Sequence, residues 1–193
     1  MNLQPTLSRL LPVAAVFASA VVLSACGSMA SSNASMYSQA NVPATVQVPA
    51  GHKVAMETVG VGEITYECRD KAGATGAMRA MEWVFVGPQA VLNDRSGKAV
   101  GSYYGPPATW ASMDGSKLTG TQLAVAPAGM GNIPYQLVKA NPAMGMGAMT
   151  NVTYIQRVAL KGGAAPAAAC SASNKGERQI VKYQADYIFW KAV

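Results

Sequence analysis

The stretch QIVKYQADYIFW, residues 179–190, decides the fold class because apolar and polar side chains alternate along it. The apolar set occupies every second position: Val181, Tyr183, Ala185, Tyr187 and Phe189. The residues between them are polar up to Asp186, namely Lys182, Gln184 and Asp186. Successive side chains of a β-strand point to opposite faces of the sheet. This stretch therefore predicts a strand with one buried face.

The same period recurs along most of the chain. In EITYECR, residues 63–69, the side chains of Ile64, Tyr66 and Cys68 share one face. Further strand candidates are HKVAMETV, MEWVFV, QAVLND, KAVGSYY, KLTGTQLAVA, IPYQLVKA and NVTYIQRVAL, which glycine-rich turns separate. No segment has a convincing helical period. The pattern predicts an all-β fold, a single antiparallel β-sandwich or barrel-like domain of about ten short strands.

The N-terminus carries an export signal. Arg9 precedes an apolar run from Leu10 to Leu23, which is too short for a stable transmembrane helix and is typical of a secretory signal peptide. The next residues, LSAC, resemble the lipobox of bacterial lipoproteins, in which the cysteine is acylated. We therefore expect residues 1–25 to be a lipoprotein signal peptide and Cys26 to be lipidated. The alternative is an ordinary cleavage after Ala25 beside an incidental cysteine.

Composition divides the rest of the chain into two parts. Residues 27–44 are rich in Ser, Ala and Asn, carry no charge and show no period, so residues 26–45 are expected to form a lipidated N-terminus and flexible tether. Residues 46–193 have the size of one domain and form the expected β domain. In Gram-negative lipoproteins, an aspartate directly after the acylated cysteine is linked to retention in the inner membrane. In this chain that position is Gly27. The expected location is the outer membrane, lipid-anchored, facing the periplasm or the cell surface.

Two cysteines remain when Cys26 is lipidated. They are Cys68 and Cys170. An even number of cysteines in an oxidising compartment is expected to pair, so a disulfide bond between these two is the default expectation. The alternative is a pair of free or metal-binding thiols. No CxxC spacing and no histidine accompanies either cysteine, which disfavours metal binding.

A search for catalytic chemistry finds little. His52 is the only histidine, and the GVGEIT stretch from Gly60 lacks the third glycine of a dinucleotide fingerprint and enters a strand. The chain has a net charge of +6, but its cations are spread without clusters. We therefore expect no catalytic residue, no cofactor and no nucleic-acid partner, whereas anionic lipid headgroups or envelope carbohydrate are compatible partners.

The stretch NPAMGMGAM, residues 141–149, raises the question of a metal site. Met144, Met146 and Met149 supply thioethers, which suit Cu(I) or Ag(I). Methionine also fills irregular apolar gaps, and the interleaved glycines are typical of a loop. We favour a hairpin loop without metal, leading into a strand that keeps Val152, Tyr154 and Val158 on one face.

Several motifs occur in an order that resembles a known but uncharacterised family. They are VPAGHKV, ITYEC, EWVFVGPQAVLNDRSGKAVGSYYGP, TWASMDGSKLTG, IPYQLVKA, VTYIQRVALKGGAAPAAAC and VKYQADYIFW, spread over roughly residues 46–190. The chain is similar to the family catalogued as domain of unknown function 3455. The resemblance implies a β-rich extracytoplasmic domain, supports the pairing of Cys68 with Cys170, and implies no established activity.

The chain departs from this family pattern at two positions. Where the family often has a His-Tyr pair before Gly-Pro and a Glu after Trp, this chain has Tyr103-Tyr104 and Ala111. An acid/base pair at those positions would be missing here. The remaining set, Tyr103, Tyr104, Trp110 and Asp114, is a candidate ligand surface for carbohydrate or a small molecule. The alternative is a turn capped by Asp114, with Gly115 at positive φ, beside a buried Trp110.

Together these features predict an outer-membrane lipoprotein whose domain serves binding or envelope structure. One alternative is an enzyme acting on envelope carbohydrate or lipid. A second is periplasmic Cu(I) or Ag(I) binding through the methionine cluster. The membrane itself is the expected partner, through the N-terminal lipid.

The LSAC motif gives the first testable prediction. Replacing Cys26→Ser removes the thiol that would be acylated, so incorporation of a palmitate analogue should be lost and the protein should accumulate as precursor or in soluble form. Metabolic labelling of wild type and variant measures this directly. Equal incorporation in both would contradict the assignment.

Overall fold

The structure is a computed structural model that describes residues 37–75 and 80–193. Its strands are β1 (His52–Asp70), β2 (Met81–Asn93), β3 (Ala99–Tyr104), β4 (Thr109–Ser112), β5 (Lys117–Ala126), β6 (Tyr135–Ala140), β7 (Val152–Gly162) and β8 (Arg178–Ala192). Two short 3-10 turns, η1 (Ala44–Val46) and η2 (Ala172–Asn174), complete the elements. No helix among the described residues has the length and apolar character needed to cross a bilayer.

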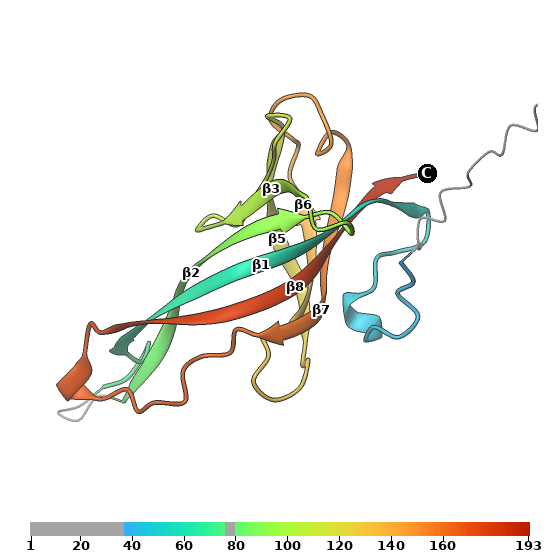
Figure 1. Ribbon diagram of the computed structural model, residues 1–193. Coiled ribbons are helices and arrows are strands. Elements are labelled where there is room, and N and C mark those ends of the chain that lie inside the picture. The colour runs from blue at the N-terminus through green and yellow to red at the C-terminus, as the bar shows by residue number, and fades with distance from the viewer. Residues whose placement is uncertain (1–36, 76–79) are drawn as a thin grey trace, which may run out of the picture. The chain divides into compact units, whose positions relative to one another are not determined.

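The eight strands form one closed antiparallel barrel in chain order (Figure 1). Closure comes from β1, which pairs with β2 on one side and with β8 on the other. Beyond the barrel wall, the second half of β1 continues as the central strand between β2 and β8. The prediction of an all-β domain is confirmed, and of the two predicted architectures the barrel is the one observed.

The strands are fewer and longer than expected because glycines inside them resemble turns in the sequence. Gly60 lies within β1, where an added Cβ would lie 2.5 Å from the Tyr187 ring. Gly87 lies within β2, where a Cβ would lie 2.2 Å from the carbonyl oxygen of Gly105. These glycines mark close approaches inside continuous strands. The four-residue strand β4 is too short to show a period and was missed.

The barrel interior holds the main core, and the alternation of β8 is as predicted. Tyr183, Ala185, Tyr187 and Phe189 are buried inside, with Val181 packed against them. On β7 the expectation of one face for Val152, Tyr154 and Val158 is wrong. A bulge between Val152 and Tyr154 places Val152 in the interior, whereas Tyr154 and Val158 lie in an outer cluster.

That outer cluster is covered by residues 37–48, which we call the strap, drawn in blue in Figure 1. Val42, Val46 and Val48 of the strap are buried against apolar side chains of β5 to β8, which are Ala126, Leu137, Val158, Ile188 and Trp190. The fully buried Gln156 donates from Nε2 to the carbonyl oxygen of Val46 at 2.7 Å. Residues 37–45, which we expected in the flexible tether, therefore pack on the barrel.

The expected disulfide bond between Cys68 and Cys170 is confirmed, with a Cα–Cα distance of 5.5 Å. Cys68 is fully buried in β1, and Cys170 lies in the connection between β7 and β8. The bond joins residues 102 positions apart. It ties that connection to the part of β1 that extends beyond the barrel wall.

A double replacement of Cys68→Ala and Cys170→Ala tests what this bond contributes. Because the bond closes a long loop in the unfolded chain, the free energy of unfolding should fall by about 2–5 kcal/mol. Urea unfolding followed by tryptophan fluorescence measures the change. A reductant should lower wild-type stability to the value of the variant and leave the variant unchanged. An unaltered unfolding midpoint in the variant would contradict the expectation.

Candidate functional site

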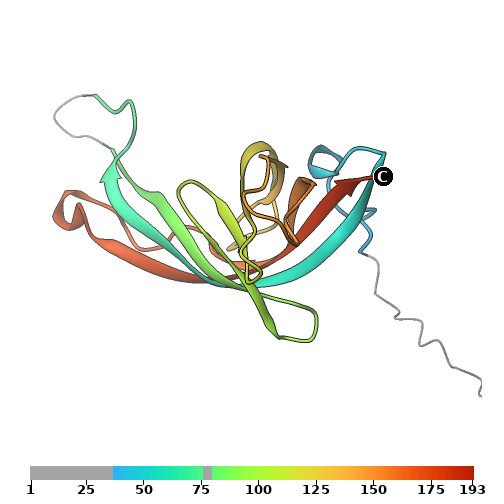
Figure 2. The same ribbon diagram turned by 90° about the horizontal axis from the view of Figure 1, so that it is seen from above.

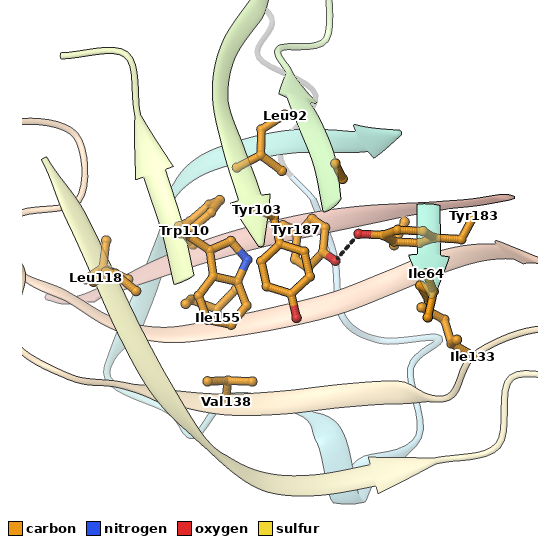
Figure 3. Close-up of a cluster of buried hydrophobic side chains, with 14 of the residues drawn as sticks. Ile64, Leu92, Tyr103, Trp110, Leu118, Ile133, Val138, Ile155, Tyr183 and Tyr187 are labelled. Carbon is orange, nitrogen blue, oxygen red and sulfur yellow. Dashed lines mark hydrogen bonds between the residues drawn. The ribbon is translucent and has the colours of Figure 1, made fainter. Parts of the chain in front are cut away.

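The structure does not bring the four candidate ligand residues onto one surface. Tyr103 and Trp110 are directly opposite each other on β3 and β4, and both point into the barrel. Their rings stack with centroids 4.7 Å apart, and the Tyr187 ring lies 4.9 Å from that of Tyr103 (Figure 3). Tyr103 is 5% exposed and Trp110 1% exposed. These two aromatic residues belong to the core.

The phenols of the interior are not suited to acid/base work near neutral pH. Tyr183 and Tyr187 place their hydroxyl oxygens 3.1 Å apart inside the barrel (Figure 3). Burial raises the pKa of Tyr183 to about 12 and that of Tyr187 well above its usual value. Burial also raises the pKa of Tyr103. All three phenols therefore stay protonated, and the interior is a packed core of the kind an eight-stranded barrel can hold.

Asp114 has the structural role proposed as the alternative. It lies in the β4–β5 turn, where Gly115 has a φ of 90°. Its Oδ1 accepts from the hydroxyl and backbone N–H of Ser116 at 2.6 and 2.9 Å, and its Oδ2 accepts from the backbone N–H of Ala148 at 2.7 Å. These hydrogen bonds, the Ser116 hydroxyl first, hold the pKa of Asp114 well below its usual value. The carboxylate thus fastens the β6–β7 connection to the β4–β5 turn.

Residues 141–151 connect β6 to β7, as the loop interpretation expected. Within this connection Met149 is 1% exposed and packs in the barrel core, whereas Met144 is 52% and Met146 81% exposed. The three sulfurs therefore do not share one environment. Among the described residues, no group of three or more His, Cys, Asp or Glu side chains is placed to hold a metal ion.

The outer face of the barrel wall carries an open groove of about 900 Å³. Two rows of outward-facing side chains cross it from β8 through β1 and β2 to β3. The Tyr104 row consists of Lys182, Glu63, Gln89 and Tyr104, and the Val61 row of Gln184, Val61, Val91 and Ser102. In both rows, neighbours are directly opposite across adjacent strands. Three strand spacings make each row about 15 Å long.

The groove has an apolar floor and polar sides. Val61 and Val91 are 47% and 49% exposed, and Tyr104 is 42% exposed. The amides of Gln89 and Gln184 offer donors and acceptors, while Lys182 forms an ion pair with Glu63. Lys161 of β7 lies opposite Gln184 and extends the Val61 row. This combination offers stacking, apolar contact and directed hydrogen bonds to one elongated ligand.

Nearby, the β2–β3 hairpin is fixed against the same outer face. This hairpin projects from the sheet and is the green hairpin at the bottom of Figure 2. From it, Arg95 donates to Glu57 Oε2 at 2.6 and 2.9 Å and to Asp186 Oδ2 at 2.6 Å. Both carboxylates are outward-facing, on β1 and β8. The guanidinium therefore holds the hairpin over the strands that form the groove floor.

The sequence contains a signal for this groove. On a strand with one buried face, the outward positions should be polar. Val61 and Val91 are apolar residues at outward positions of β1 and β2, and both are exposed. In VGVGEI and QAVLN, apolar residues occupy outward as well as inward positions, and this pattern indicates an exposed apolar surface. Only the pairing of β1 with β2, which places these two valines side by side, shows that they form one surface.

A comparison with protein families matches residues 49–191 to the family described as a protein of unknown function, DUF3455. The chain belongs to this family. The matched region starts three residues before β1, after the strap, and ends one residue before the end of β8, so it covers the barrel wall except for that residue. The resemblance found in the sequence motifs is confirmed. Neither the curated proteins nor the solved structures contain a match to the chain.

Within this family domain, the role of Asp114 gives a testable prediction. An Asp114→Ala variant loses the acceptor for the Ala148 N–H, so the amides of Ala148 and Met149 should exchange with solvent much faster than in wild type. The amides of β8, far from the turn in sequence, serve as the internal control. Unchanged protection of Ala148 would contradict this role.

The pH dependence has a defined sign. Because the folded pKa of Asp114 lies below its unfolded value, its contribution is present above an unfolded pKa of about 3.9 and is lost as the pH falls through the folded value. Wild-type protection of Ala148 should therefore persist below pH 4. Hydrogen exchange measured across acid pH checks this persistence.

Proposed function

We propose that this protein is a lipid-anchored lipoprotein of the bacterial envelope whose barrel domain binds an envelope carbohydrate chain in the outer groove. The proposal has two parts, the anchor at Cys26 and the binding groove. Residues 1–36 lie outside the described residues, so the anchor rests on the sequence alone.

The disulfide bond supports an extracytoplasmic location. Disulfides persist in oxidising compartments and are rare where thiols are kept reduced. The bond between Cys68 and Cys170 joins two distant parts of the family domain. This is the setting to which the apolar run before LSAC would deliver the chain.

The groove is the observation that carries the binding part. Sugars present apolar faces and many hydroxyls, so their sites combine an exposed ring with amides and few fixed charges. Tyr104 supplies the ring, Val61 and Val91 the apolar floor, and Gln89 and Gln184 the amides. An open groove that crosses four strands favours a chain-like ligand over a compact one.

The same residues favour binding over hydrolysis. Most glycosidases use two carboxyl groups that flank the bond they cleave. Among the described residues that line the groove, Glu63 is the single carboxylate, and it is paired with Lys182. The second cavity, described below, has no carboxylate in its lining. A binding module is therefore the function that this geometry supports best.

A binding measurement with soluble peptidoglycan glycan strands tests the proposal. Wild type should bind, and Tyr104→Ala should bind roughly tenfold more weakly because it loses the ring for stacking. Tyr104→Phe, which keeps the ring, should retain most of the affinity. Isothermal titration calorimetry gives the dissociation constants.

Phe85→Ala is the matched control. Phe85 is also an exposed aromatic residue, at 51%, but it packs edge-on against Tyr66 on the opposite face of the same sheet. This variant should bind like wild type. Absence of binding by wild type, or equal losses in Tyr104→Ala and Phe85→Ala, would contradict the proposed groove.

A further inference from the structure

One end of the barrel exposes several methionines together. This end, which we call the methionine end, comprises the β4–β5 turn, the β6–β7 connection, the start of β1 and the end of β8. Met113, Met144 and Met146 are 75%, 52% and 81% exposed there. The turn and the connection lie next to each other at the top of Figure 1. Such an exposed apolar group indicates a contact surface.

These methionines stand on a fixed platform. The backbones of Met144 and Lys117 exchange two hydrogen bonds of 2.7 and 2.9 Å. Asp114 holds the Ala148 N–H, and the buried Met149 fixes the same connection in the barrel core. The thioether side chains are thus flexible groups presented by a rigid backbone.

Lysines surround the methionines. Lys53 and Lys191 lie opposite each other on β1 and β8, Lys117 begins β5, and Lys139 is near the end of β6. Within the described part of the chain, none of these four lysines forms an ion pair. Of the neighbouring carboxylates, Glu57 is paired with Arg95, whereas Asp114 accepts hydrogen bonds from uncharged groups of Ser116 and Ala148 and so offsets one of the four lysine charges. The methionine end therefore keeps an uncompensated positive charge.

A cavity of about 640 Å³ opens at the same end. Its lining includes Lys139, His52, Met146 and Tyr154 and, among the described residues, no carboxylate. The Pro49 carbonyl oxygen, 3.0 Å away, can only accept, so Nδ1 of His52 donates to it and Nε2 remains free. With its proton on Nδ1, His52 presents an acceptor at Nε2, so the Lys139 ammonium and the hydroxyls of the lining are the groups that can donate to an anionic headgroup above the apolar wall.

The chain approaches the barrel at this same end. Tyr37 packs edge-on against Trp190, near the end of β8, and its backbone N–H donates to Glu57 of β1. Only 37 − 26 = 11 residue steps separate Tyr37 from Cys26. A fully extended chain of that length spans about 40 Å at most. A lipid on Cys26 would therefore keep the methionine end near the bilayer.

From these observations we propose that the methionine end docks on the surface of a lipid bilayer that carries anionic phospholipid headgroups. The exposed methionines enter the boundary between headgroups and acyl chains, the four lysines contact phosphates, and one headgroup phosphate occupies the cavity beside Lys139. The inference rests on the proposed lipid anchor for its orientation. It does not depend on the carbohydrate groove.

Two single-cysteine probes test the docking in the full-length protein. Met146→Cys and Met130→Cys, each labelled with an environment-sensitive fluorophore, replace one exposed methionine at each end of the barrel, since Met130 lies fully exposed in the β5–β6 connection. Each is mixed with vesicles of phosphatidylcholine, with or without phosphatidylglycerol. At position 146 the emission should shift to the blue and be quenched by spin-labelled lipid only when phosphatidylglycerol is present. At position 130 it should not change.

Charge variants separate docking from anchoring. In the Met146→Cys background, Lys117→Gln with Lys139→Gln should weaken the affinity for the vesicles roughly 25-fold, because each lysine near an anionic surface contributes about fivefold. The matched pair Lys71→Gln with Lys175→Gln, beyond the other end of the barrel, should leave it unchanged. Flotation of the same samples reports the lipid anchor, and glycan binding reports the groove. A signal at position 146 that equals that at position 130, or that persists without phosphatidylglycerol, would overturn the proposal.

Discussion

Pairing of the first strand with the last is the constraint on which the other features depend. Because β8 pairs with β1 along most of its length, the sheet closes and every side chain of the wall is assigned to the interior or to the outer face. The interior takes the stacked aromatic core around Tyr187. The outer face is divided between the strap, which covers β5 to β8, and the groove, which crosses β8, β1, β2 and β3.

Alternation along single strands was enough to predict which side chains of β8 face the barrel interior, and the cysteine count was enough for the disulfide bond. The first feature depends on the alternation of apolar and polar residues within one strand, and the second on the oxidising conditions of the compartment. The strand boundaries depended on more distant contacts. Gly60 and Gly87 resemble turn residues until Tyr187 and Gly105 are placed against them. The bulge in β7, which places Tyr154 on the outer face and Val152 in the interior, likewise cannot be read from the alternation of apolar residues in the sequence.

The candidate site shows the same limit. Tyr103 and Tyr104 are adjacent in sequence and chemically alike, so composition gave no reason to separate them. Because they occupy successive positions on β3, their side chains point to opposite faces of the sheet. Tyr103 lies in the core, stacked on Trp110, and Tyr104 lies in the groove. Asp114 could be recognised as a turn residue from its own neighbours, but its bond to Ala148 required the fold. Local chemistry was predictable, and the combination of residues from separate strands was not.

Closure by β1 and β8 also constrains the order in which the strands can pair as the domain folds. As the domain folds, each strand from β2 to β7 can pair with the strand before it, but the second edge of β1 can pair only with β8, the last strand of the barrel. Until then β1 and β7 both present unpaired edges, which invite association with other chains. The barrel therefore closes only when the fifteen residues of β8 pair with both β1 and β7.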